Sequence, residues 1–237
     1  MPIRLSGVVA HRGAPRGWRE NTLAGIAESV RLGAAAIEVD VRTTADGVPV
    51  LHHDDRLPHP LLGRATRPWG VPIAEAGFDR LRAAAPHVPT LGEALAVVRG
   101  TGVPLVLDIG TIETARACLA EPDGGGAWFC GAVGALAWLR ASAPGVPLLL
   151  SWNRRRPPPE PLLAEVAPTM FNPSHRYLTP AAVDSWHERG IGVCTWTVDS
   201  RRRRLRLRRW GVDAIITNDL AAAVRDRDCG AAGRRKS

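Results

Sequence analysis

Short apolar runs recur along the chain, and most of them alternate with segments of helical periodicity. Apolar runs bounded by glycine and polar residues indicate buried strands, whereas apolar positions three and four residues apart indicate amphipathic helices. The predicted strands cover residues 7–10, 36–41, 48–52, 105–109, 127–130, 147–150, 169–171, 192–196 and 214–217. The predicted helices cover residues 23–32, 91–99, 132–141, 181–189 and 201–210.

This alternation predicts an α/β fold, and its repetition predicts a single-domain (β/α)8 TIM barrel. The connection between Val41 and Val48 is too short for a helical crossover and contains Asp46-Gly47, a typical hairpin turn. We therefore expect residues 48–52 to form a short β-hairpin with strand 2, outside the barrel. A two-residue turn would place His53 opposite Asp40.

Carboxylates stand near the ends of two predicted strands. Glu38 and Asp40 are two residues apart, so their side chains share a face that opens onto the mouth of a barrel. Two hard oxygen donors suit Mg²⁺ or Ca²⁺ rather than zinc, and Asp108 at the end of another strand is the candidate third ligand. A solvated edge strand is the alternative for Glu38 and Asp40, and a helix cap is the alternative for Asp108.

Two histidines and an arginine follow apolar runs near these carboxylates. His11 and His53 together form a candidate acid–base pair because histidine titrates near neutral pH, although either one alone could be structural. The guanidinium of Arg12 offers a fork of donors suited to a phosphate or a carboxylate. This region of the chain is therefore the predicted functional site.

The composition of the chain indicates its kinds of partner and its compartment, but it does not identify the function. The chain has 237 residues, of which 45% are apolar, and a net charge of +8 that favours anionic partners: phosphate esters, nucleic acid or acidic lipid headgroups. The four cysteines show no CxxC spacing, which argues against a zinc site and a dense disulfide framework. No run suits a membrane span, and a first strand beginning by Val8 leaves no room for a signal peptide. We expect a cytoplasmic protein, and the oligomeric state stays open.

The C-terminal part is rich in arginine. Residues 201–209 read RRRRLRLRR, where we expect Leu205 and Leu207 on one helix face and arginine over the solvated rest. Because no aromatic residues are interleaved with the arginines, we expect no nucleic-acid partner. The barrel domain is expected to cover residues 7–224, and residues 225–237 are expected to form a flexible basic tail.

The motif set resembles one known family. His11-Arg12-Gly13, Glu20-Asn21-Thr22 and residues 37–54 (IEVDVRTTADGVPVLHHD) closely resemble the glycerophosphodiester phosphodiesterase family. Residues 88–95 resemble the start of a family helix, and residues 171–199 and 211–219 resemble its final strands. The resemblance covers most of residues 7–224 and implies a phospholipase-C-like TIM barrel.

The resemblance also implies a function and roles for particular residues. It implies metal-dependent hydrolysis of glycerophosphodiesters to glycerol 3-phosphate and an alcohol, on a small-molecule substrate. By resemblance, the general acid and base are His11 and His53, and Arg12 contacts the phosphate. The ligands of Mg²⁺ or Ca²⁺ implied by the resemblance are Glu38, Asp40 and Asp108. Further substrate-binding residues implied by it are Glu20, Asn21 and Trp196.

Two departures from the family pattern leave alternatives open. The family's fourth strand typically ends Leu-Glu-Ile-Lys, whereas this chain has Leu107-Asp108-Ile109-Gly110, and the Ser-Phe pair after the fifth strand is missing near Cys130. The related sphingomyelinase-D-like branch also carries Asp at the third ligand position, so a lysophospholipase-D or sphingomyelinase-D-like activity is the second hypothesis. A degenerate barrel that binds a phosphorylated ligand without turnover is the third.

Overall fold

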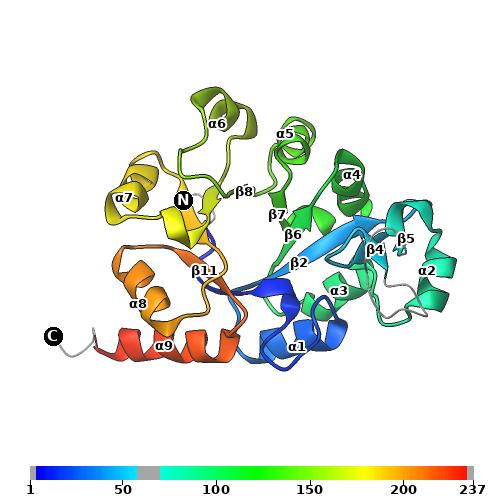
Figure 1. The fold of residues 1–237 in the computed structure, drawn as a ribbon, viewed down its shortest axis with the longest axis horizontal. Helices are drawn as coiled ribbons and strands as arrows, with labels where there is room; N and C mark the ends of the chain where they lie inside the picture. The colour runs from blue at the N-terminus through cyan, green and yellow to red at the C-terminus, as the bar shows by residue number, and fades with distance from the viewer. Residues whose placement is uncertain (1–3, 58–69, 234–237) are drawn as a thin grey trace.

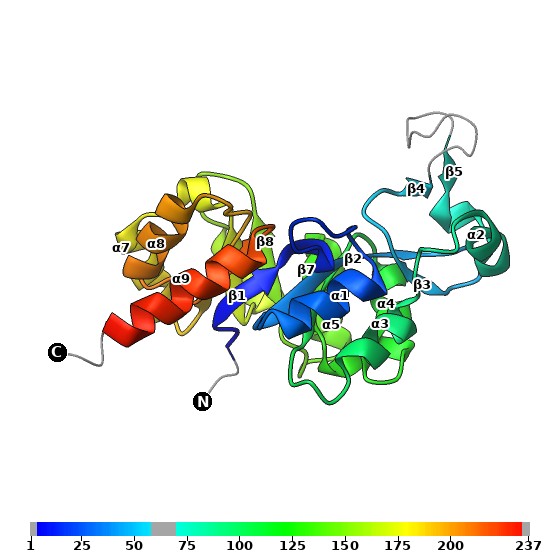
Figure 2. The same ribbon diagram turned by 90° about the horizontal axis from the view of Figure 1, so that it is seen from below.

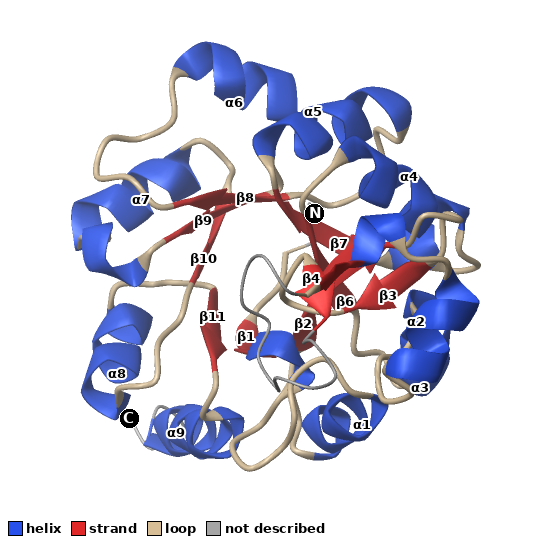
Figure 3. Ribbon diagram, turned by 45° about the vertical axis from the view of Figure 1, so that its right-hand side comes forward, coloured by secondary structure: helices blue, strands red, loops and turns tan. Residues whose placement is uncertain are grey.

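The computed structural model describes residues 4–57 and 70–233 of the chain. Eight parallel strands form a ring that helices surround on the outside (Figures 1 and 3). The barrel strands are β1 (Gly7–Ala10), β2 (Ala36–Thr43), β6 (Leu105–Ile109), β7 (Trp128–Gly131), β8 (Leu149–Trp152), β9 (Met170–Pro173), β10 (Gly192–Thr195) and β11 (Ala214–Thr217). Their order around the ring is β7-β6-β2-β1-β11-β10-β9-β8, and a parallel bridge between Phe129 and Leu148 closes it. The predicted TIM barrel is confirmed.

The helices occupy the connections between the barrel strands, except for the last helix, which follows the final strand. They are α1 (Leu23–Arg31), α2 (Phe78–Ala84), α3 (Leu91–Val98), α4 (Ile112–Ala120), α5 (Val133–Ser142), α6 (Glu160–Val166), α7 (Pro180–Glu188), α8 (Arg201–Arg209) and α9 (Leu220–Gly233). Thr90 and Glu93 form a capping box at the start of α3, as their spacing indicates. The sequence pattern did not predict α4, whose buried face consists of the small residues Thr114, Ala115 and Cys118 rather than large apolar ones.

Side chains alternate between the barrel interior and the helical layer along each strand. An apolar cluster fills the interior and includes Val9, Ala36, Val106, Trp128, Leu149, Met170, Cys194 and Ala214. Two residues further along three of these strands, the same face presents Asp108, Ser151 and Asn172. The interior is therefore apolar below and polar at the carboxyl ends of the strands, where the functional site lies.

The hairpin after β2 forms, but its register differs from the expected one. Strand β3 (Pro49–Leu51) pairs antiparallel with β2, and Leu51 lies opposite Val41. The N–H of His52 donates to the carbonyl of Asp40 at 3.0 Å, so His52 and not His53 is opposite Asp40. The loop holds three residues instead of two, because the Thr44 N–H donates to the Val48 carbonyl and Gly47 adopts a φ of +86°.

A small lobe follows β3 beside the barrel mouth. It contains the antiparallel strands β4 (Arg56–Leu57) and β5 (Val71–Pro72), a 3₁₀ turn over Ile73–Glu75, and α2. Figure 2 shows this lobe projecting to one side of the barrel. Its own apolar cluster consists of Val50, Leu57, Ile73, Leu81, Ala85 and Val88.

The expectation that Leu205 and Leu207 share one face of helix α8 is wrong. Leu207 is buried but Leu205 is only half-buried, because residues two apart lie about 200° apart around a helix and cannot share a face. The second buried position is Arg204, whose guanidinium donates to Asp226 of α9 at 2.9 Å. Helix α9 runs to Gly233, so the segment expected to form a basic tail is helical as far as that residue. Within residues 4–57 and 70–233, every helix is too short or too polar to cross a membrane.

Candidate active site

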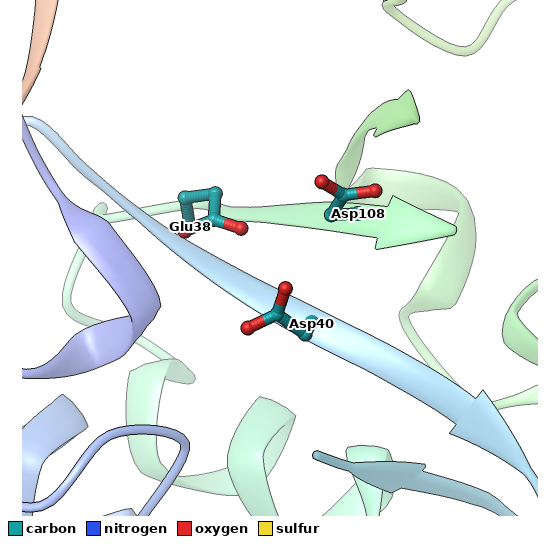
Figure 4. Close-up of side chains that lie close together, drawn as sticks. All are labelled: Glu38, Asp40 and Asp108. Atoms are coloured by element: carbon teal, nitrogen blue, oxygen red, sulfur yellow. The ribbon is translucent and has the colours of Figure 1, made fainter. Parts of the chain in front are cut away.

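Three carboxylates converge at the carboxyl ends of two neighbouring strands. Glu38 and Asp40 project from β2, and Asp108 projects from β6, where it is paired in register with Asp40 (Figure 4). Oxygen atoms of the three side chains lie within 4.8 Å of one another. Glu38 and Asp40 are almost fully buried, with 4% and 5% of their surface exposed. The structure thus brings the three predicted metal ligands into one cluster.

The electrostatics of this cluster favour a bound cation. Burial, together with the neighbouring charges of Asp40 and Asp108, raises the pKa of Glu38 well above its ordinary value. Burial and the charge of Asp40 raise the pKa of Asp108 to about 6. Carboxylates that repel one another in a buried place are stabilised by a positive ion between them, and three oxygen donors suit a hard divalent cation. The cluster is therefore consistent with a divalent-metal site.

Arg12 lies beside the cluster because of an unusual backbone conformation. It sits in a 3₁₀ turn over His11–Gly13, directly after β1, with a left-handed φ of +54°. Its backbone N–H donates to Oε2 of Glu38 at 2.8 Å, and its side-chain Nε lies 3.4 Å from Oδ2 of Asp40. A second guanidinium nitrogen donates to Glu20 at 2.9 Å. The residue thus contacts two of the carboxylates, one through its backbone and one through its side chain.

His11 is held by a chain of hydrogen bonds that orients its ring. Its Nδ1 lies 2.8 Å from Oδ1 of Asn218, and Asn218 donates its backbone N–H and its Nδ2 to the carboxylate of Asp199. Since the Asn218 amide donates to Asp199, its oxygen must accept from His11, which places the proton of a neutral ring on Nδ1. Burial lowers the pKa of His11. A neutral His11 therefore presents an unprotonated Nε2, which lies 3.9 Å from Oε2 of Glu38.

His53 reaches the same site in spite of the shifted register. Strand β3 ends at Leu51, and the chain then bends instead of continuing along β2. The His53 ring is more exposed than that of His11, and its Nδ1 lies 2.8 Å from the carboxylate of Asp54. The bend after the strand, rather than pairing opposite Asp40, brings His53 to the carboxylates.

These groups surround one cavity of about 190 Å³, which we call the acidic cavity. It is lined by His11, Arg12, Glu38, Asp40, His53, Asp108, Cys130, Ser151, Asn172, Trp196 and Ile216. The indole Nε1 of Trp196 donates to the carbonyl of Asn172 at 2.9 Å, which fixes the ring at the wall. Burial, with the charges of Asp108 and Glu38, raises the pKa of the Cys130 thiol well above its ordinary value, so the thiol is neutral.

Glu20 and Asn21 take a different position from the other predicted site residues. Both line a neighbouring cavity of about 60 Å³ together with His52 and His53, and they contact the acidic cavity through Arg12 and Asp40. Glu20 is half exposed, whereas Asn21 is buried against Asp40. This geometry favours a positioning role for Asn21.

Sequence reasoning missed several members of the site. Asn218 and Asp199 hold His11, and Ser151 and Asn172 line the acidic cavity, but none of the four was predicted. A usable signal existed, because each is a polar residue at or just beyond the carboxyl end of a strand, as Glu38 and Asp108 are. Gly110 leaves free space at its position, because a Cβ built there would meet nothing within 4 Å.

Comparisons with known proteins agree with this geometry. The sequence matches the Glycerophosphoryl diester phosphodiesterase family over residues 11–121 and 127–222. Glycerophosphodiester phosphodiesterase 1 of Bos taurus is 35% identical over 114 residues, which are 43% of this chain and 33% of the bovine protein. A glycerophosphodiester phosphodiesterase of Caldanaerobacter subterraneus subsp. tengcongensis is 25% identical over 90% of this chain and 93% of its own.

Solved structures share the fold. A phosphodiesterase of Oleispira antarctica, in complex with the product sn-glycerol-3-phosphate, aligns with a TM-score of 0.78 and 22% identity over 94% of this chain and 97% of its own. A glycerophosphodiester phosphodiesterase of Thermotoga maritima aligns with a TM-score of 0.76 and 22% identity over 94% and 99% of the two chains. The chain spans about a third of the length of the bovine relative. Since the family match extends over most of the barrel, the chain belongs to the glycerophosphoryl diester phosphodiesterase family.

Proposed function

We propose that the protein is a metal-dependent phosphodiesterase that hydrolyses glycerophosphodiesters to glycerol 3-phosphate and an alcohol. One observation carries the proposal: three carboxylates, two histidines and an arginine line a single cavity at the carboxyl ends of the barrel strands. That edge is where TIM-barrel enzymes hold their active sites. The names of the bacterial relative and the product in the Oleispira antarctica structure support the substrate class.

The residues of the acidic cavity meet the demands of phosphodiester cleavage. Glu38, Asp40 and Asp108 would hold Mg²⁺ or Ca²⁺, which when bound would neutralise charge on a non-bridging phosphate oxygen. The guanidinium of Arg12 would oppose the remaining phosphate charge.

Proton transfer falls to the two histidines. The unprotonated Nε2 of His11 suits a general base that takes a proton from water or from the neighbouring glycerol hydroxyl. His53 then gives a proton to the oxygen of the departing alcohol. Because His11 is anchored through Asn218 and Asp199, its ring is held in the tautomer that this role requires.

A substrate panel with and without a chelator tests the proposal. We expect release of glycerol 3-phosphate from glycerophosphocholine, glycerophosphoethanolamine or glycerophosphoglycerol in the presence of Mg²⁺ or Ca²⁺, and loss of all turnover in EDTA. Turnover that survives EDTA would contradict the role of the carboxylates.

The same panel separates the two alternatives. Headgroup release from lysophospholipids in preference to the water-soluble diesters would favour a lysophospholipase-D-like activity. This alternative is worth testing because Asp108 is the residue that the sphingomyelinase-D-like branch carries at the third ligand position. Binding of glycerol 3-phosphate without turnover of any diester would indicate a non-catalytic barrel. This alternative is worth testing because Gly110 stands where the family pattern has a lysine.

A further inference from the structure

Large apolar side chains are exposed on the face of the barrel where the acidic cavity opens. Among the side chains that the structure describes, three large apolar ones are exposed: Trp18, Ile112 and Tyr177, with 46%, 37% and 42% of their surface accessible. Trp18 follows β1, Ile112 follows β6 and Tyr177 follows β9, each before or at the start of the next helix. All three therefore stand at the carboxyl ends of the barrel strands, and two of them are aromatic residues with a polar group.

Exposed arginines lie in the same connections as the two aromatic residues and in the neighbouring ones. Six of them are exposed and have no ion-pair partner in the part of the chain that the structure describes: Arg19, Arg154, Arg155, Arg156, Arg176 and Arg202. They stand in the connections after β1, β8 and β9 and at the start of α8, which follows β10. Guanidinium groups left free in this way are available to an anionic partner.

These arginines gather on one side of the barrel mouth. Strands β8, β9, β10, β11 and β1 are consecutive in the ring, and we call the connections that follow them the basic half of the mouth (Figure 3). The acidic side chains of the basic half are already engaged: Glu20 by Arg12, Glu160 by Arg189, Asp199 by Asn218 and Asp219 by Arg16. The other side of the mouth, after β2 and β6, carries exposed acidic residues: Asp46, Asp54, Glu75 and Glu113. The charge of the mouth is therefore asymmetric.

An apolar groove of about 230 Å³ opens beside the arginines that follow β8. Its apolar lining includes Trp152, Phe171, Pro173, Leu178 and Trp186, and its polar lining includes Arg154, Arg155 and Tyr177. Trp152 and Pro173 are paired in register and directly follow Ser151 and Asn172, whose side chains line the acidic cavity. Because neighbouring side chains of a strand point to opposite faces, the groove lies on the outer side of β8 and β9 and is separate from the acidic cavity.

We propose that the basic half of the mouth docks on the surface of an anionic lipid bilayer. Tryptophan and tyrosine are enriched at membrane–water interfaces, and an anionic leaflet attracts arginines near its surface. Docking in this way places Trp18 and Tyr177 at the level of the headgroups and the free guanidinium groups on lipid phosphates.

The arrangement of the aromatic residues favours a bilayer over a nucleic acid. A single strand needs a row of stacking platforms along one groove, whereas Trp18 and Tyr177 stand singly on two different connections. A bilayer accepts apolar side chains scattered over a broad face. This inference goes beyond the proposed function and does not depend on it, and it turns the opening of the acidic cavity toward the headgroup layer.

Co-sedimentation of the full chain with vesicles tests the inference. The vesicles consist of phosphatidylcholine alone or of phosphatidylcholine with phosphatidylserine. We expect binding to the anionic vesicles, weak binding to the neutral ones, and release from the anionic vesicles as the salt concentration rises. The double variant Arg155→Gln/Arg156→Gln should lower the affinity for anionic vesicles about tenfold or more. The matched control is Arg206→Gln/Arg209→Gln, which removes the same charge from exposed positions toward the other end of α8 and should change the affinity little.

A second pair of variants tests the aromatic contribution. Trp18→Ala should lower the affinity for anionic vesicles about tenfold, because it removes apolar surface from the interface without changing the charge. The control is Ile112→Ala, which removes an exposed apolar side chain from the acidic side of the mouth and should change the affinity little. The melting temperature and the turnover of glycerophosphoethanolamine without vesicles should stay at the wild-type values in all four variants.

Several results would overturn the inference. The first is wild-type protein that does not bind the anionic vesicles or that binds the neutral ones equally well. An equal loss of affinity in the two arginine double variants would also overturn it, because net charge alone would then explain the binding. Tighter binding to a generic single-stranded oligonucleotide than to anionic vesicles would replace it with a nucleic-acid surface. Since vesicle binding needs no turnover, each of these results leaves the proposed function standing, and failure of the proposed function leaves this inference standing.

Discussion

Asn21 and Asp40 exchange two hydrogen bonds. The side-chain Nδ2 of Asn21 donates to Oδ2 of Asp40 at 2.8 Å, and the backbone N–H of Asp40 donates to Oδ1 of Asn21 at 3.0 Å. Asn21 has a left-handed φ of +55° and donates its own N–H to the carbonyl of Arg12 at 2.7 Å. It therefore connects the loop after β1 to β2 and fixes the orientation of one carboxylate of the cluster.

Replacing Asn21 should weaken metal binding more than it changes the chemistry. Residues that orient metal ligands typically contribute about 10–100-fold to metal affinity. We expect Asn21→Ala to raise the metal concentration for half-maximal activity by about this factor, with most of the turnover restored at saturating metal. Titration of activity with Mg²⁺ or Ca²⁺ measures it, and exposed Asn153→Ala is the control. A loss of turnover that no metal concentration restores would contradict a purely orienting role.

Metal affinity should fall steeply in mild acid. The pKa of Asp108 is raised to about 6, and that of Glu38 is also raised well above its ordinary value, so both carboxyl groups take up protons in mild acid in the metal-free protein. Because a cation must displace these protons, the apparent dissociation constant should rise about tenfold or more per pH unit below pH 6. Isothermal titration calorimetry between pH 5 and pH 8 checks this, and a pH-independent affinity would contradict it.

The metal-free protein should lose stability as pH rises through the same range. The folded-state pKa of Asp108, about 6, exceeds the ordinary value of 3.8, so the folded state binds more protons than the unfolded state between these pH values. The free energy of unfolding attributable to this group therefore falls as pH rises and is lowest above pH 6. We expect Asp108→Asn to stabilise the metal-free protein by about 1–3 kcal/mol at pH 7 and by much less at pH 4.5. Urea unfolding in EDTA at both pH values measures the difference.

The two histidines should be needed for turnover and not for folding. General acid–base groups typically contribute about 10²–10⁴-fold to the rate, so we expect His11→Ala and His53→Ala each to lower kcat by at least that order. Melting temperatures should stay close to that of the wild-type protein, because both rings are partly exposed at the cavity. Wild-type turnover in both variants would refute the assignment.

The buried ion pair between α8 and α9 should contribute to the stability of the fold. Arg204 is 1% exposed and donates to Asp226 at 2.9 Å, and it also donates to the carbonyl of Asp199 at 2.6 Å. Removing one partner of such a pair leaves an uncompensated buried charge and costs about 3–5 kcal/mol. We expect Asp226→Ala to lower the free energy of unfolding by this amount in denaturant titration. Exposed Asp184→Ala on α7 is the control and should change little.

The barrel and the carboxylate cluster were predictable because both follow from local patterns. Alternating strands and helices indicate parallel strands, and parallel strands bring their carboxyl ends to one edge, where Glu38, Asp40 and Asp108 were expected and lie. The register of β3 was not predictable in the same way. Asp46-Gly47 signals a turn, but the loop length depends on the hydrogen bond between Thr44 and Val48, which the sequence pattern does not distinguish from a two-residue turn.

Long-range partners escaped prediction for a different reason. Asn218 reaches His11 across 207 positions of the sequence, and Asp226 neutralises Arg204 from the next helix. Periodicity reports which face of an element is apolar, so a charged residue such as Arg204 counts as solvated until its partner is known. The Arg-rich pattern of α8 therefore concealed a buried position.

At Arg12, the left-handed backbone and the charged side chain act on different carboxylates. Its N–H reaches Glu38 because of the φ of +54°, whereas its guanidinium reaches Asp40 and Glu20. Glycine and asparagine tolerate this conformation, and β-branched residues do not. In a saturation-mutagenesis screen, replacement by Asn or Gly would report the loss of the cation alone, whereas replacement by Val or Ile would also disturb Glu38. The activity of variants at residue 12 should therefore depend on the backbone preference of the new residue as well as on its charge. A surface position that matters only for its charge would not show this dependence.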